Sequence, residues 1–238
     1  MITPDDQKRL IEILQPHWDA EVASQRFEDI AAGKEPGHRI ADYAEERTNE
    51  FVVGEKLPVA YQVNPKKAQR DRSMGDFWLR SGDPAIYNPV NVKTGIEKRG
   101  GQPNMVSLEK LTQALLAREI DSYWLLLVRI SAAPPRTVTL KIINLLDYLQ
   151  FIHFDAGPGQ TMLKNDVFYA YDGGPQPLSI DDAVHALAEI RRDGNRRLLA
   201  NRESKLNSLE ARLLQFDSGV DIKQESALLV PVEYAEKQ

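Results

Sequence analysis

Two short segments of this chain carry side chains with the chemistry of phosphodiester hydrolysis. Asp76 follows Gly75, and beyond a turn at residues 81–84 the next segment carries Asn91 and Lys93. Both segments predict β-strands, and side chains alternate between the faces of a strand, so Asn91 and Lys93 are expected to project together. A hairpin would fold Asp76 back beside them. An acid, an amide oxygen and an ammonium at one point suit a divalent-metal site.

Helices are expected before this hairpin. Apolar periodicity over residues 4–32 predicts an amphipathic helix interrupted near Pro16. A second helix over residues 38–53 carries Asp42 and Glu45 on its flank. One of these carboxylates could reach the metal, with Glu45 preferred over Asp42. The alternative is that both are ordinary solvent-exposed helix surface.

The segments after the hairpin predict a helix and two strands. Ser107 is a good N-cap for a helix to about residue 119, with Leu108, Leu111, Leu115 and Leu116 on its apolar side. Residues 122–130 are almost continuously apolar, which is typical of a central strand buried on both faces. Residues 137–146, rich in β-branched side chains, predict a further strand.

The carboxy-terminal third predicts a helix from Ser179 to about Phe216, with a break at Gly194. Its apolar side chains form a stripe, which we expect to pack on the core. Pairing with a second subunit is the alternative. The stripe consists of Leu198, Leu199, Leu206, Leu209, Leu213 and Leu214.

Gly75-Asp76 followed by Asn91-Val92-Lys93-Thr94 resembles the active-site hairpin of the PD-(D/E)xK nuclease superfamily, in particular of type II restriction endonucleases. Three further segments fit this resemblance in the right order. Residues 37–45 resemble the helix before the hairpin, residues 99–104 resemble the polar loop after the catalytic strand, and residues 157–165 resemble a later core turn.

The resemblance implies an α/β fold, with a restriction-endonuclease-like mixed central sheet flanked by helices and a helical C-terminal extension. It divides the chain into an N-terminal helical region (1–36), a catalytic core (37–170) and a helical C-terminal region (171–238) for packing or dimerisation. We expect the three regions to form one compact domain.

The activity that the resemblance implies is Mg2+-dependent, sequence-specific cleavage of double-stranded DNA by a restriction endonuclease. Asp76, Asn91, Lys93 and Glu45 are the catalytic candidates. Asp76, the Asn91 amide oxygen and the carbonyl of Val92 would hold Mg2+, which lowers the pKa of a bound water, and Lys93 would position that water.

Polar and basic side chains near the cleft are the candidates for contacts with DNA, since Gln and Asn can pair with adenine and Arg with guanine or phosphate. Loop polarity without base recognition is the alternative for each of them. These candidates are Lys98, Arg99, Gln102, Asn104, Gln160 and Lys164. By family analogy the enzyme would act as a homodimer on a palindromic site, with a cognate DNA methyltransferase implied genetically.

Asn91 departs from the family pattern, in which Asp or Glu stands two residues before the lysine. A neutral amide oxygen coordinates Mg2+ less tightly than a carboxylate does. Either the Asn-x-Lys form is natural and active, which we favour, or the chain is a nuclease-fold protein that binds DNA and cuts poorly. A repair or structure-specific nuclease is a further alternative.

Composition agrees with a soluble, cytoplasmic protein that has no membrane partner. The chain has 238 residues, no cysteine and no long apolar run. Its net charge is −5, but basic residues cluster at 66–72, at 98–99 and at 191–205. Zinc-protease, phosphate-loop and serine-hydrolase motifs are absent from the sequence.

Overall fold

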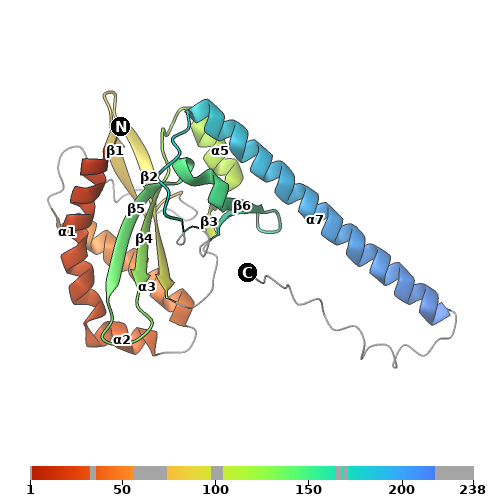
Figure 1. Ribbon diagram of the computed structural model, residues 1–238, viewed down its shortest axis with the longest axis horizontal. Coiled ribbons are helices and arrows are strands. Elements are labelled where there is room, and N and C mark those ends of the chain that lie inside the picture. The colour runs from red at the N-terminus through yellow and green to blue at the C-terminus, as the bar shows by residue number, and fades with distance from the viewer. Residues whose placement is uncertain are drawn as a thin grey trace. The chain divides into compact units, whose positions relative to one another are not determined.

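The computed structural model describes residues 2–32, 36–55, 74–97, 104–164, 168 and 171–217 (Figure 1). These residues form a mixed α/β structure, in which a mixed sheet of four strands is flanked by helices and followed by a C-terminal helix. Within the same ranges, every helix is too short or too polar to cross a membrane.

The main sheet contains β1 (Phe77–Ser81), β2 (Ile86–Ile96), β4 (Trp124–Ile130) and β5 (Val138–Asn144), in the order β1-β2-β4-β5. β1 and β2 form the predicted antiparallel hairpin. β4 is parallel to β2 and antiparallel to β5, which confirms its predicted central position. Its side chains alternate between two apolar clusters: Leu126 and Val128 belong to one, and Leu125 and Leu127 to the other.

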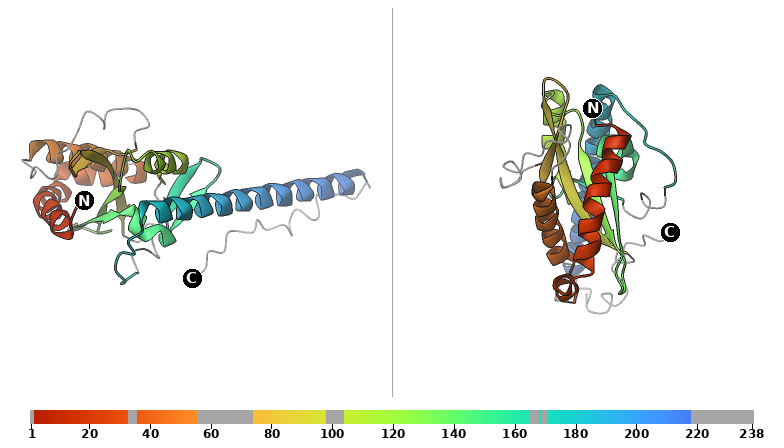
Figure 2. Two further views of the ribbon diagram at one scale, coloured as in Figure 1. Left: turned by 90° about the horizontal axis from the view of Figure 1, so that it is seen from above. Right: turned by 90° about the vertical axis from the view of Figure 1, so that its left-hand side faces the viewer.

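Three helices cover one face of this sheet: α1 (Pro4–Val22), α2 (Gln25–Ala31) and α3 (Pro36–Gly54) (Figures 1 and 2). The predicted interruption near Pro16 is wrong, because α1 continues through this residue. Leu14 and Trp18, on either side of it, are fully buried, and this packing offsets the hydrogen bond that proline cannot donate. The break comes instead at Ser24, whose side chain caps α2 by accepting the N–H of Phe27 at 3.1 Å.

The opposite face is covered by α5 (Leu108–Leu116) and a second sheet that the sequence did not predict. This sheet contains β3 (Asn104–Ser107), β6 (Ile152–Asp155) and β7 (Gln160–Leu163), in the order β3-β7-β6, and η2 (Leu145–Phe151) leads into it. Ser107 caps α5 as predicted. Leu116 is 64 % exposed, however, so its expected place on the apolar side of that helix is wrong.

The last helix, α7 (Ile180–Asp217), runs through Gly194 without the predicted break. A Cβ at Gly194 would lie 2.6 Å from the carbonyl oxygen of Phe154, so glycine is required for close packing rather than for a bend. The chain divides into two compact units at this point, and the second begins at Asn195. The expected burial of the leucine stripe is wrong for five of its members, which are 53–70 % exposed: Leu199, Leu206, Leu209, Leu213 and Leu214.

Candidate active site

Asp76 occupies the bend immediately before β1. Its N–H donates to the carbonyl of Val90 at 2.8 Å, and its Oδ2 accepts the N–H of Val92 at 2.6 Å. β1 begins at Phe77, which is opposite Val90, so the strand is too short to supply a main-chain acceptor for the N–H of Val92. The carboxylate of Asp76 accepts this N–H instead. The predicted approach of Asp76 to the second strand of the hairpin is therefore confirmed.

The backbone around this carboxylate is tightly packed. A Cβ added to Gly75 would lie 2.8 Å from Cβ of Pro89 and 2.9 Å from the main-chain N and O of Val90. Only glycine allows the chain to approach β2 this closely. In an extended strand the N–H and C=O of one residue point to the same edge, so the carbonyl of Val92 faces the side occupied by Asp76.

Asn91 is buried on the face of the sheet opposite Val90 and Val92, as strand alternation predicts. Its Nδ2 donates to the carbonyl of Met105 at 3.1 Å and to the hydroxyl of Tyr123 at 3.0 Å. Its Oδ1 is also buried and has no hydrogen-bond partner among the described residues. A buried oxygen without a donor is costly, so this atom is suited to an external ligand.

Tyr123 links Asn91 on β2 to the segment that precedes β1. It is fully buried, it accepts from Asn91, and its hydroxyl donates to the carbonyl of Met74 at 2.7 Å. Burial raises the pKa of the Tyr123 hydroxyl above its usual range, so the phenol remains a proton donor at neutral pH. It therefore holds Asn91 and the segment leading to Asp76 in one arrangement.

Lys93 and Glu45 complete the cluster. Lys93 Nζ lies 3.8 Å from Oε1 of Glu45 on α3, and the lysine side chain is only 16 % exposed. Burial and then the neighbouring charge of Asp76 raise the pKa of Glu45 to about 7, against the opposing effect of Lys93. Burial also raises the pKa of Asp76, although the Val92 N–H and Lys93 act in the other direction. Asp42 is exposed and contributes only its charge to Glu45.

The oxygen atoms on and beside β2 are of the kind that Mg2+ prefers: the carboxylates of Asp76 and Glu45, the free amide oxygen of Asn91 and the carbonyl of Val92. The partnerless Asn91 Oδ1 is the observation that favours a cation. Over the described ranges, three or more His, Cys, Asp or Glu side chains nowhere gather closely enough to hold a metal. A cation at this site would therefore depend on the amide and main-chain oxygens as well as on two acids.

The sequence interpretation missed two polar groups in this region. The apolar run over residues 122–130 includes Tyr123, and its hydroxyl is the signal, because a buried phenol needs a polar partner. Asn49 lies one turn after Glu45 on α3, and its Oδ1 is likewise buried without a partner. Its position four residues from Glu45 was the available signal.

The candidate DNA contacts are only partly described. Lys98, Arg99 and Gln102 lie outside the described residues, as does the basic cluster at 66–72. Asn104 begins β3, whose next residue, Met105, accepts the Asn91 hydrogen bond, so the second sheet adjoins the site. Gln160 begins β7 half-buried, and Lys164 follows that strand and is exposed. Among the described residues, neither Gln160 nor Lys164 forms a hydrogen bond or an ion pair with Asp76, Glu45 or Asn91.

Comparison with known proteins leaves the site to be interpreted from its own geometry. No protein-family model matches the chain, and no curated protein matches its sequence.

Proposed function

We propose that this chain is a Mg2+-dependent endodeoxyribonuclease that cleaves double-stranded DNA in a sequence-specific manner, with a restriction-endonuclease-like fold. The supporting observation is the convergence of Asp76, Glu45 and Lys93 at β2, the strand that also carries the partnerless amide oxygen of Asn91. Carboxylates, an amide oxygen and a sheltered ammonium are the groups that hydrolysis of a phosphodiester requires.

Each residue has a separate task in this proposal. Asp76, Asn91 and the carbonyl of Val92 would hold Mg2+, which when bound supplies positive charge against the scissile phosphate and acidifies a nearby water. Lys93 offsets the developing phosphate charge, and because it is largely buried its charge is weakly screened. Glu45, whose pKa burial and the charge of Asp76 raise to about 7, would accept a proton near neutral pH when it does not itself hold the cation.

Cleavage of a long unmethylated DNA tests this proposal. The chain as it stands should produce discrete fragments with Mg2+ and none with EDTA. Lys93→Ala should lower the cleavage rate by roughly a hundredfold or more, as removal of a charge-stabilising group does in other enzymes. Lys8→Ala is the matched control, because Lys8 is a 77 % exposed lysine on α1, and it should cut normally.

The second candidate is a DNA-binding protein of the same fold with little turnover. The neutral amide of Asn91, engaged by Met105 and Tyr123, favours it, because it leaves the metal site one negative charge short of the usual pattern. In that case the chain as it stands lowers the electrophoretic mobility of DNA without cutting it, and Asn91→Asp restores cleavage. A preference for branched or damaged DNA would indicate a repair or structure-specific nuclease. If neither form cuts, the nuclease proposal is wrong.

A further inference from the structure

The second half of α7 carries an apolar stripe with a period of seven residues. Leu199, Leu206 and Leu213 are each seven positions apart, and Leu209 and Phe216 each follow one of them by three. These five side chains are 53–69 % exposed. Apolar residues alternating at spacings of three and four form the a and d positions of a two-stranded coiled coil.

The charges beside the stripe indicate which partner fits it. With Leu206 at an a position, Lys205 is at g and Glu210 is at the following e position. In a parallel pair of helices the g residue of one chain faces the next e residue of the other. Lys205 of each chain would therefore face Glu210 of the other chain, which gives two equivalent ion pairs. An antiparallel pair faces g with g and e with e, which brings like charges together.

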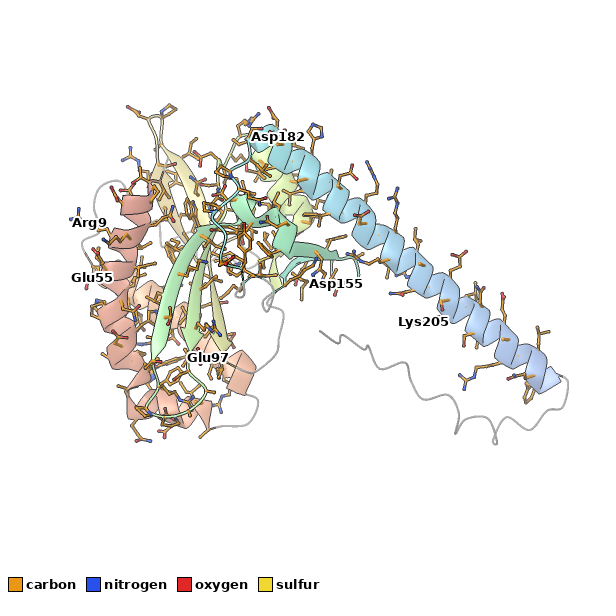
Figure 3. The ribbon with its side chains drawn as sticks, viewed as in Figure 1. Arg9, Glu55, Glu97, Asp155, Asp182 and Lys205 are labelled. Carbon is orange, nitrogen blue, oxygen red and sulfur yellow. The ribbon has the colours of Figure 1, made fainter. Side chains whose placement is uncertain are left out.

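We propose that residues 195–216 of α7 form a parallel coiled coil with a second copy of this chain. The segment spans about 33 Å of helix, which is three heptads. Asn195 and Arg202 take the first two d positions, and polar residues at such positions lower stability while they favour a single register. The a and d positions form the seam of this coiled coil, and Lys205, which is labelled in the second half of α7 in Figure 3, flanks it. This interface does not depend on the proposed nuclease activity.

Neighbouring leucines provide a matched test of the surface. Leu213 lies on the stripe and is 53 % exposed, whereas Leu214 lies at the adjacent b position and is 70 % exposed. Sedimentation equilibrium of the full chain should show a dimer. Leu213→Ser removes one seam leucine from each copy and should raise the dissociation constant of the dimer roughly a hundredfold. Leu214→Ser should leave that dissociation constant within about threefold of the parent's. A chain that remains monomeric overturns the proposal. The stripe would then be covered by residues 218–238 of the same chain or by a different protein.

Cross-linking tests the orientation, since the chain has no cysteine of its own. Leu199→Cys and Leu213→Cys lie about 21 Å apart along the helix. Both variants should form a disulfide-linked dimer on mild oxidation, because only a parallel, in-register pair brings both positions next to their own copies. Ala211→Cys, at an f position facing away from the seam, is the control. Cross-linking through only one of the two seam positions would overturn the parallel arrangement.

Charge reversal tests the pairing of Lys205 with Glu210 of the second copy, which is the argument for a second copy as the partner. Lys205→Glu and Glu210→Lys should each weaken the dimer several-fold, because each places like charges at two g–e contacts. The double variant restores opposite charges and should return the dissociation constant towards that of the parent. If the double variant is weaker than both single variants, these residues do not face one another and the proposed register is wrong.

Discussion

Replacement of Asn91 by aspartate probes the site most directly. The Asn91 amide donates to the carbonyl of Met105 at 3.1 Å and to Tyr123 at 3.0 Å, and a carboxylate can donate to neither. Loss of a partner for a buried carbonyl costs about 1–3 kcal/mol, and the new charge is buried in the neighbourhood of Asp76. We therefore expect Asn91→Asp to lower the free energy of unfolding by about 3 kcal/mol in EDTA. For a chain of 238 residues this corresponds to a fall in Tm of roughly 6–12 °C.

Mg2+ should reverse much of this loss if the site binds a cation. The introduced carboxylate adds a charged ligand, so saturating Mg2+ should raise the Tm of Asn91→Asp by more than it raises the Tm of the parent. Asn91→Leu is the matched control, because it removes the same donated hydrogen bonds without adding a ligand and should gain nothing. Differential scanning calorimetry with and without Mg2+ measures all three proteins.

The pH dependence of Asn91→Asp has a definite sign. Burial raises the folded-state pKa of the introduced carboxyl above its unfolded value of about 3.9, and its protonated form can again donate to Met105. The loss of stability should therefore be small below about pH 4 and should grow as the pH rises through the folded-state pKa. An Asn91→Asp protein as stable as the parent in EDTA at pH 8 would refute the role of the Asn91 hydrogen bonds. No effect of Mg2+ on either protein would refute the metal site.

Two further substitutions test the packing that supports the site. Gly75→Ala should lower the free energy of unfolding by about 1–3 kcal/mol, because its Cβ would meet the Val90 backbone at 2.9 Å. Gly95→Ala on β2, where a Cβ would have open space, should have no such cost, and urea denaturation compares the two variants. Arg47→Met should destabilise the chain by about 2–3 kcal/mol, since Glu21, which is 8 % exposed, loses the guanidinium that lies 2.7 Å away. Restoring part of that loss with Glu21→Gln in the same background would support this cause, and no loss in Arg47→Met would contradict it.

Local sequence patterns determined much of this structure. Strand alternation and one turn were enough to predict the hairpin, because hairpin geometry depends on neighbouring residues. They also placed Asn91 on the face opposite Val90 and Val92 and returned Asp76 to the edge of the second strand. Ser107 and the apolar run of β4 were equally informative, since capping and burial leave direct compositional signals.

Only the tertiary structure decided which distant groups meet. Met105 and Tyr123 are separated from Asn91 by 14 and 32 residues, and no local periodicity predicts that their polar atoms would use the amide N–H groups and leave its oxygen free. The choice between Glu45 and Asp42 likewise needs the tertiary structure, because only the packing of α3 on β2 brings Glu45 within 3.8 Å of Lys93. In α7, heptad spacing determined that one side is apolar, but the same spacing suits a buried helix and an exposed one. The exposure of that stripe depends on what the rest of the chain covers, and this is a property of the folded molecule.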